Sequence, residues 1–277
     1  MSENASPTQL KCPNNSANSI HVSLFTRLQR HPLPIEAHFE RCLVLTYALP
    51  SQVLRPLIPP GLTVDTFGDL GFIAIALVQT RNLRPAGLPS SLGKDFFLSG
   101  YRVFTRYASR TGRTLRGLRI LRSDADSRLM TCVGNLLTHY NYHRARVSCR
   151  ETEIGFNIRV QTADKASDLD VDVDLADIVD SPPQGSPFAS IAESRRFAGP
   201  LPYTFDYERA TNSIVLIHGI RQAWKPRPVQ VAVHRCSFFD APHFKNCSPA
   251  LASAFYLENI PYRWERGIRE PLDQVPA

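Results

Sequence analysis

The chain has 277 residues, of which 43% are hydrophobic and 21% are charged. This composition is typical of one large globular domain and excludes an intrinsically disordered chain. No run approaches the ~20 apolar residues that a membrane helix needs, so we expect no membrane partner. The net charge is +7 and comes mainly from arginine, because lysine occurs only at positions 11, 94, 165, 225 and 245 among 32 basic residues.

The arginine excess bears on possible partners, since arginine makes bidentate contacts with carboxylates and phosphates. An acidic small molecule or a nucleic acid could use it. No nucleic-acid recognition motif or basic tail accompanies the charge, so nucleic acid is not the expected partner.

The cysteines and the N-terminus indicate where the protein works. The six cysteines are scattered and contain no CxxC pair, which favours free thiols in a reducing compartment. Residues 1–18 are polar and lack the apolar core of a secretion signal. We therefore expect a cytoplasmic protein with a disordered N-terminal tail over residues 1–34 and a single domain over residues 35–277.

Many short strands and few helices are predicted along the chain. Strands are expected at residues 39–47, 62–67, 72–80, 96–107 and 114–122, with a helical turn at 50–57. Apolar residues from Leu129 to Tyr140 recur at helical spacing and predict a helix. Strands follow at 146–160 (broken at Gly155), 168–175, 213–220 and 228–238, and a final helix is predicted from Leu251 to Ile260. The pattern favours an α+β, mainly β barrel over an alternating α/β sheet.

Metal and cofactor motifs are not supported. The alternating aspartates at positions 168–174 lack the glycine and glutamate of a calcium loop and read as the wet face of a strand. His139 and His143 stand four residues apart without a supporting carboxylate or cysteine nearby. Phosphate-loop, dinucleotide and serine-nucleophile motifs are absent from the sequence. We therefore expect no metal and no cofactor.

Arginines recur at every third position from Arg113 to Arg122, namely Arg113, Arg116, Arg119 and Arg122. On a strand this spacing sends them alternately to opposite faces. An arginine that points inward needs a buried carboxylate or an anionic ligand, because an unpaired buried charge is costly.

The phrase from Arg41 to Leu62, which ends in Pro56-Leu57-Ile58-Pro59-Pro60-Gly61-Leu62, resembles the opening of the acetoacetate decarboxylase superfamily. Its closest resemblance is to the uncharacterised YqjF-like branch. Residues 123–129, 140–146 and 223–228 resemble further phrases of the family in the same order, so the likeness covers roughly residues 38–240. It implies an antiparallel β-barrel with flanking helices and a ligand-sized interior.

The resemblance also implies that this chain lacks the reactive lysines of the decarboxylase. The decarboxylase forms a Schiff base through the first of two adjacent lysines, which is activated by a lowered pKa. The matching positions here hold Tyr142 and His143, and a phenol cannot form an imine. Upstream, the usual glutamate and asparagine of the branch are matched by Leu98 and Gly100, while its arginine remains as Arg102.

The sequence therefore predicts a barrel that binds a small anionic or carbonyl-bearing molecule without a Schiff-base lysine. Tyr142 and His143 are the candidate catalytic residues, and Arg102, Arg119 and His218 are the candidate ligand-binding residues. Tyr142 and His143 are adjacent on a strand, so only one of them would face inward.

Three alternatives stay open. One is a lyase or decarboxylase that acts on a keto acid by acid–base chemistry without an imine. The second is a lyase that does form an imine, which would need Lys94 or Lys225 as the amine. The third is a nucleic-acid or regulatory binder, and a homo-oligomer is compatible with each.

Overall fold

The computed structural model describes residues 23–222 and 224–272. Its strands are β1 (Ile35–Pro50), β2 (Leu62–Val64), β3 (Leu70–Pro85), β4 (Lys94–Ala108), β5 (Thr114–Ala125), β6 (Tyr142–Glu151), β7 (Gly155–Thr162), β8 (Leu169–Asp174), β9 (Tyr203–Glu208), β10 (Ser213–Arg221), β11 (Arg227–Pro228), β12 (Gln230–Cys236), β13 (Ala250–Trp264) and β14 (Ile268–Pro271). Its α-helices are α1 (Leu24–Leu28), α2 (Ser51–Leu54), α3 (Arg128–Leu137) and α4 (Ile191–Ala198), and its short 3₁₀ helices are η1 (Arg55–Leu57), η2 (Ser90–Leu92), η3 (Arg209–Thr211), η4 (Ser237–Asp240) and η5 (Pro242–Phe244).

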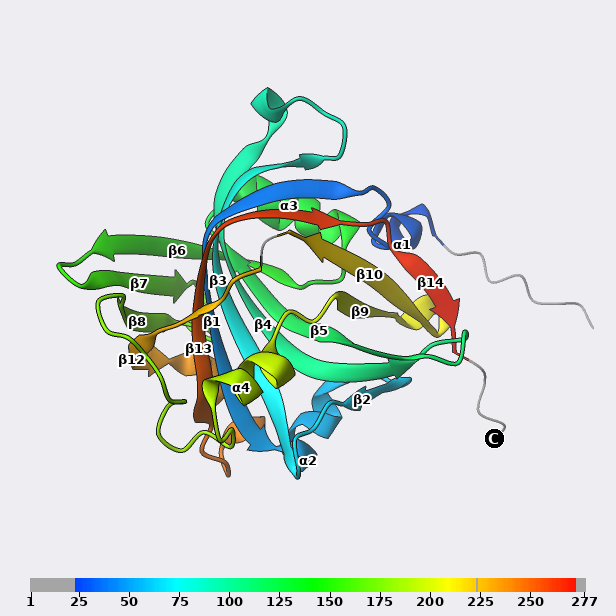
Figure 1. The fold of residues 1–277 in the computed structure, drawn as a ribbon. Helices are drawn as coiled ribbons and strands as arrows, with labels where there is room; N and C mark the ends of the chain where they lie inside the picture. The colour runs from blue at the N-terminus through cyan, green and yellow to red at the C-terminus, as the bar shows by residue number, and fades with distance from the viewer. Residues whose placement is uncertain (1–22, 223, 273–277) are drawn as a thin grey trace, which may run out of the picture.

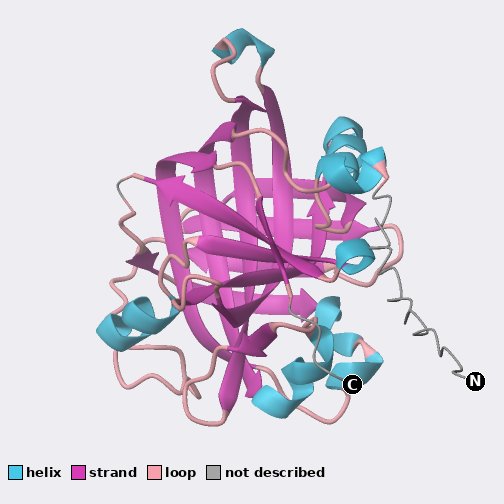
Figure 2. Cartoon of the chain, turned by 90° about the vertical axis from the view of Figure 1, so that its right-hand side faces the viewer, coloured by secondary structure: helices cyan, strands magenta, loops and turns pink. Residues whose placement is uncertain are grey.

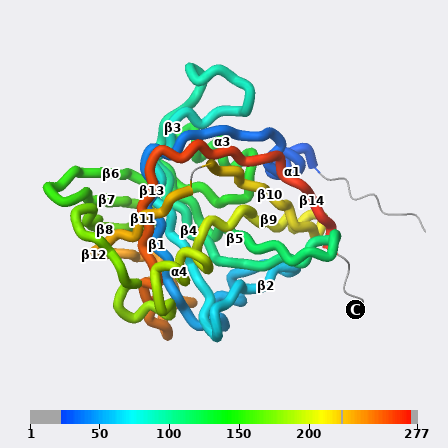
Figure 3. Tube along the Cα trace, viewed as in Figure 1, coloured from blue at the N-terminus to red at the C-terminus, as the bar shows by residue number. Residues whose placement is uncertain are grey.

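The strands form a ring with a second layer on one side, and the helices lie at its periphery (Figures 1 and 2). Pairings run in the order β5, β9, β10, β13, β1, β3, β4 and back to β5, which closes the ring (Figure 3). The mainly β ring agrees with the sequence-based fold class. It departs from a purely antiparallel barrel at β5, which pairs in parallel with β9 and with β6.

The second layer explains the long apolar runs of the ring strands. Strands β6, β7, β8 and β12 continue from β5 and pack beside β1, β3 and β4. On β3, Ile73, Ile75 and Leu77 face this second layer, whereas Ala76 and Val78 face the ring interior. A strand that is covered on both faces is apolar at consecutive positions, which is why residues 72–78 contain no polar residue.

The final helix predicted from Leu251 to Ile260 is wrong, because these residues belong to β13. This strand pairs with β1 over most of its length and is buried on both faces, with Tyr256 in one core and Leu257 in the other. Consecutive apolar residues in a covered strand include positions three and four apart, so they imitate helical spacing.

The N-terminal segment is only partly described. Residues 1–22 lie outside the described residues. Residues 23–34, which we expected to belong to the tail, contain α1 and pack against the domain. His31 N–H donates to Leu137 O, at 2.9 Å, and Arg30 forms a salt bridge with Glu208, at 2.6 Å. None of the helices in the described parts of the chain is long and apolar enough to cross a membrane.

Candidate functional site

A small cavity of about 80 Å³ lies inside the ring of strands. Its walls come from β1, β3, β4, β5, β10 and β13 and from the segment that leads from α3 into β6. Most of the lining is apolar, including Cys42, Val78 and Ile120. The charged side chains that line it are Arg102 and Arg221. We call this space the central cavity.

Arg102 reaches the central cavity from β4 because Gly100 leaves room for it. A Cβ added at Gly100 would stand 3.0 Å from the Arg102 Nη2 and 3.1 Å from its Nε. Residues 100 and 102 share one face of the strand, so the guanidinium lies over the bare Gly100. The Arg102 Nε is buried and has no hydrogen-bond partner among the described residues.

Arg221, at the end of β10, is the second cation of the central cavity. Its guanidinium donates to the carbonyl of Leu201, at 2.6 Å, and lies over the rings of Trp224 and Tyr262, with Cζ 4.9 and 5.5 Å from their centroids. Burial lowers the pKa of Arg221, and the nearby positive charge of Arg102 lowers it further. The side chain still stays charged at neutral pH, because the ordinary pKa of arginine lies several units above neutrality.

Neither arginine of the central cavity has a carboxylate partner within the described residues. The Cys42 thiol interacts electrostatically with both arginines, but burial raises the pKa of Cys42 to about 12. The thiol is therefore neutral at pH 7 and balances neither charge.

Tyr142 lines the central cavity from the start of β6, and its position is fixed by α3. The Asn135 side chain clamps its backbone, accepting from Tyr142 N at 2.8 Å and donating to Tyr142 O at 2.9 Å. A Cβ at Gly134 would stand 2.5 Å from the Tyr142 ring, so the helix approaches the ring at its only glycine. Burial raises the pKa of Tyr142 to about 12, and the phenol stays protonated at neutral pH.

Tyr140 is a second phenol at the same wall. Asn141 adopts a left-handed conformation with φ of 51°, which asparagine tolerates well, and places Tyr140 and Tyr142 with ring centroids 6.3 Å apart. The Tyr140 hydroxyl is buried without a hydrogen-bond partner in the described structure. Two neutral O–H donors therefore accompany the two guanidinium groups.

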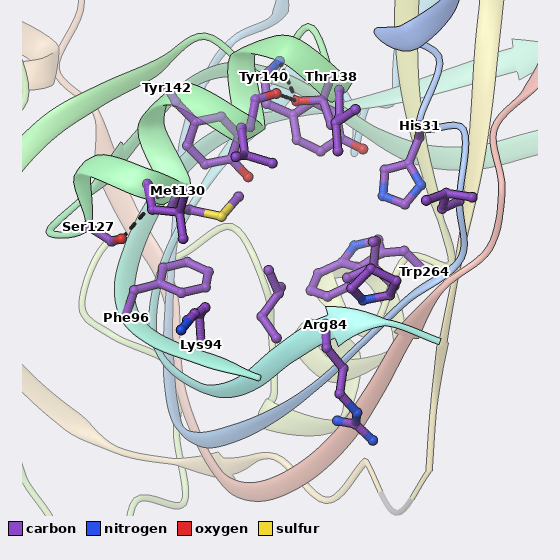
Figure 4. A pocket seen from close by; sticks show the side chains of 18 of the residues that line it. His31, Arg84, Lys94, Phe96, Ser127, Met130, Thr138, Tyr140, Tyr142 and Trp264 are labelled. Atoms are coloured by element: carbon purple, nitrogen blue, oxygen red, sulfur yellow. Dashed lines mark hydrogen bonds between the residues drawn. The ribbon is translucent and has the colours of Figure 1, made fainter. Parts of the chain in front are cut away.

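A larger apolar pocket of about 330 Å³ adjoins the central cavity (Figure 4). The two spaces share three lining residues, namely Tyr140, Tyr142 and Trp264. The outer walls come from α3, η2, the ends of β3 and β4 and the segment from His31 to Ile35. We call this space the outer pocket.

The other sequence-predicted site residues lie elsewhere. His143 is half-buried on the neighbouring position of β6, is not among the cavity residues, and its Nε2 lies 3.1 Å from the Asn141 Oδ1. Arg119 forms an ion pair with Asp206 of β9. His218 is exposed and its ring stacks on Tyr203, with centroids 5.0 Å apart.

A β-bulge keeps a further arginine out of the central cavity. The pairing of β4 with β5 shifts between Tyr101 and Arg102, so that Ile120 and Ser123 both face the cavity. Arg122 consequently points to the second layer, where it pairs with Asp124 and Asp164 at 2.8 and 2.7 Å. Bulges often re-aim side chains next to functional sites in this way.

Sequence reasoning missed Arg221, Cys42 and Tyr140. Arg221 stands next to the family-like phrase at residues 223–228, and that proximity was a usable signal. Arg221 lies near Arg102, however, only because the ring closes through β10 and β13. No local sequence pattern predicts that closure.

Comparisons with known proteins identify the family and the fold. The family model of the uncharacterized conserved proteins DUF2071 matches residues 36–260. Comparison with curated protein sequences gives no match.

Solved structures share the fold at low sequence identity. An acetoacetate decarboxylase-like enzyme from Sphingomonas wittichii RW1 is 11% identical, with a TM-score of 0.57, over 88% of this chain and 95% of the other. Acetoacetate decarboxylase from Legionella pneumophila is 10% identical, with a TM-score of 0.57, over 86% and 88% of the two chains. The enduracididine biosynthesis enzyme MppR complexed with pyruvate is 11% identical, with a TM-score of 0.53, over 96% and 98%. The chain therefore belongs to the DUF2071 family, the YqjF-like branch that its sequence resembles, and it has the fold of the acetoacetate decarboxylase-like superfamily.

Proposed function

We propose that the protein binds a small organic carboxylate in the central cavity, with Arg102 and Arg221 as its anchors. The observation that carries this proposal is the pair of guanidinium groups that faces one enclosed space without a carboxylate among the described residues. Removing a charge from water is costly unless an opposite charge or several hydrogen bonds replace the solvent. A bound anion would supply both.

The ion pairs of the other arginines in this region support the proposal. Arg116, Arg119 and Arg122 pair with Asp65, Asp206 and Asp124 respectively. The fold thus provides a buried carboxylate for each of these arginines. Arg102 and Arg221 differ from them, because the described residues provide no carboxylate partner for either.

The neutral donors favour a carboxylate or keto acid over a bare inorganic ion. Tyr140 and Tyr142 stay protonated and can donate to a carbonyl or carboxylate oxygen, as phenols do in sites that stabilise an oxyanion. The pyruvate complex of MppR, a protein of the same fold, is consistent with this class of ligand.

The proposed binding requires no imine. No lysine is found among the described residues that line the central cavity. Lys94 is exposed at the rim of the outer pocket, and Lys225 is exposed beside Trp224.

Titration calorimetry with pyruvate tests the anchors. Charge-assisted hydrogen bonds contribute about 1.5–3 kcal/mol, so we expect Arg102→Met and Arg221→Met each to weaken pyruvate binding by about 10–100-fold. Arg113→Met, which removes an exposed arginine outside the cavity, is the matched control and should bind as the wild type does. Equal affinity in all four proteins would refute the proposal.

A lyase that acts on a keto acid by acid–base chemistry is the second candidate function, and the buried Tyr142 phenol is the observation that favours it. Turnover of acetoacetate that is lost in Tyr142→Phe would support it. Borohydride treatment with pyruvate should leave every lysine unlabelled. A reduced adduct on Lys94, an N-(1-carboxyethyl) group, would show that imine chemistry takes place at the outer pocket.

A further inference from the structure

We infer that the ligand is an amphipathic monocarboxylic acid whose hydrocarbon tail occupies the outer pocket while its carboxylate meets Arg102 and Arg221. This inference rests on the proposed carboxylate binding and names the class of acid. It commits the outer pocket to one occupant, the tail of the same molecule.

The two spaces adjoin across a shared aromatic wall. Tyr140, Tyr142 and Trp264 line both the central cavity and the outer pocket. The central cavity, at about 80 Å³, accommodates a head group, whereas the outer pocket, at about 330 Å³, is within the range of small-molecule sites. A single molecule that passes between the shared aromatic residues would fill both.

The outer pocket offers apolar surface almost everywhere. Its wall from α3 consists of Leu129, Met130, Val133 and Leu137, and Leu33, Leu92 and Phe96 face them from the other segments. Leu33, Leu92 and Leu129 are exposed by 51%, 57% and 52% of their surface. Such exposed apolar clusters around a pocket are typical of ligand sites rather than of free surface.

The polar groups of the outer pocket are already used or neutral, except for the exposed Lys94 at its rim. The Arg84 guanidinium donates to Leu88 O and Asn82 O, and it points away from the pocket in Figure 4. The Ser127 hydroxyl accepts from Met130 N at the start of α3, and the Thr138 hydroxyl donates to Gly134 O. Burial lowers the pKa of His31 to about 4, so its ring is neutral. Beyond Lys94 at the rim, a ligand here meets mainly apolar walls until it reaches the tyrosines and the arginine pair.

Chain length provides the test. We would titrate straight-chain carboxylates from butanoate to dodecanoate, with decanol as a ligand that lacks the charge. Each buried methylene contributes about a fourfold gain in affinity, so the dissociation constant should fall about fourfold per carbon until the pocket is full. Decanol should bind more weakly than decanoate by at least the factor that Arg102→Met removes from decanoate.

Two blocking variants and a matched control locate the tail. Val133 and Leu136 stand on the same helix with exposures of 38% and 40%, but only Val133 lines the pocket. Val133→Trp should abolish the gain per methylene, whereas Leu136→Trp should keep the wild-type gain and affinity. Leu92→Trp fills the pocket from η2 and should act like Val133→Trp if that variant is poorly folded.

The outcomes separate the two proposals. Carboxylate binding that depends on Arg102 but not on chain length would overturn the tail and preserve the proposed function. Equal binding of decanol and decanoate, or no binding of any acid, would overturn both. A chain-length gain that survives Val133→Trp and Leu92→Trp would place the tail elsewhere and contradict the inference.

Discussion

Arg102 carries a positive charge into an apolar cavity, and the free protein gains no ion pair from it among the described residues. Placing such a group there lowers stability unless a ligand is present. The same chain contains a natural comparison in Arg119, whose ion pair with Asp206 is internal. The two arginines should therefore respond to substitution with opposite signs.

Arg102→Met should stabilise the ligand-free protein by about 1–2 kcal/mol, because an unsatisfied buried donor disappears. For a domain of this size that is a rise in Tm of roughly 2–8 °C. Arg119→Gln should lower stability by about 3 kcal/mol, because it leaves the buried Asp206 without its partner. Calorimetric melting in anion-free buffer measures both, and a fall of Tm in Arg102→Met would contradict the uncompensated charge.

His31 supplies a pH dependence that can be isolated. Burial lowers its pKa to about 4 from an ordinary value near 6.5, so the unfolded chain binds the proton more readily than the folded protein does. The His31 contribution to stability is full above pH 6.5 and is lost as the pH falls from 6.5 to 4. The loss amounts to about 3 kcal/mol, at 1.36 kcal/mol per pH unit.

His31→Asn removes this titration while retaining a side chain suited to the left-handed backbone, whose φ is 55°. Urea unfolding at pH 7 and pH 4 should show the wild type losing about 3 kcal/mol more than the variant. Parallel losses in the two proteins would mean that His31 titrates normally in the folded state.

At the scale of elements, the strands were largely predictable and their closure was not. The strand prediction at 96–107 corresponds to β4, and that at 114–122 corresponds to β5. The helix prediction over Leu251 to Ile260 failed because β13 is covered on both faces. The bulge that turns Arg122 away from the cavity depends on pairing between β4 and β5. The spacing of residues in the sequence does not predict it.

Helix α3 offers a sharp test of how the site is built. Replacing a helical glycine with alanine normally stabilises by about 0.5–1 kcal/mol. At Gly134 the new Cβ would meet the Tyr142 ring at 2.5 Å. Gly134→Ala should instead destabilise by about 1–3 kcal/mol, the usual cost of overpacking.

Cys132→Ala is the control on the same helix, since Cys132 is exposed and alanine is the better helix former. Chemical denaturation of both variants measures the difference. Stabilisation by Gly134→Ala would show that the helix and the ring of Tyr142 are not in contact.

At the scale of the whole molecule, the net charge of +7 is the excess of 32 lysine and arginine residues over 25 aspartate and glutamate residues. Many arginines on the described part of the chain form ion pairs with carboxylates, including Arg30, Arg41, Arg81, Arg84, Arg106, Arg159 and Arg263. Paired arginines contribute little to a field that would attract phosphates.

We therefore expect weak retention on heparin, with elution below about 0.15 M salt, where nonspecific electrostatic binding is already weak. A heparin column with a salt gradient makes this measurement. Retention that persists to high salt and falls steeply with it would favour the nucleic-acid alternative that the sequence left open.

The fold family and the cavity wall at Tyr142 could be predicted from sequence because short local motifs indicate both of them. Residues 140–146 resemble the decarboxylase segment that carries its lysines. Arg102 lies in β4 and matches the arginine of the YqjF-like branch in that resemblance. Arg221 and Trp264 join the site only after the ring closes. A site assembled from distant strands is thus readable from sequence only in the parts that carry a motif.

The most direct test of the account is a crystal structure of the protein soaked in sodium bromide, with the anion located by its anomalous scattering. The account predicts a bromide peak in the central cavity in contact with the Arg102 and Arg221 guanidinium groups, and its loss in Arg102→Met. Bromide found only on the outer surface, with an empty central cavity, would contradict it.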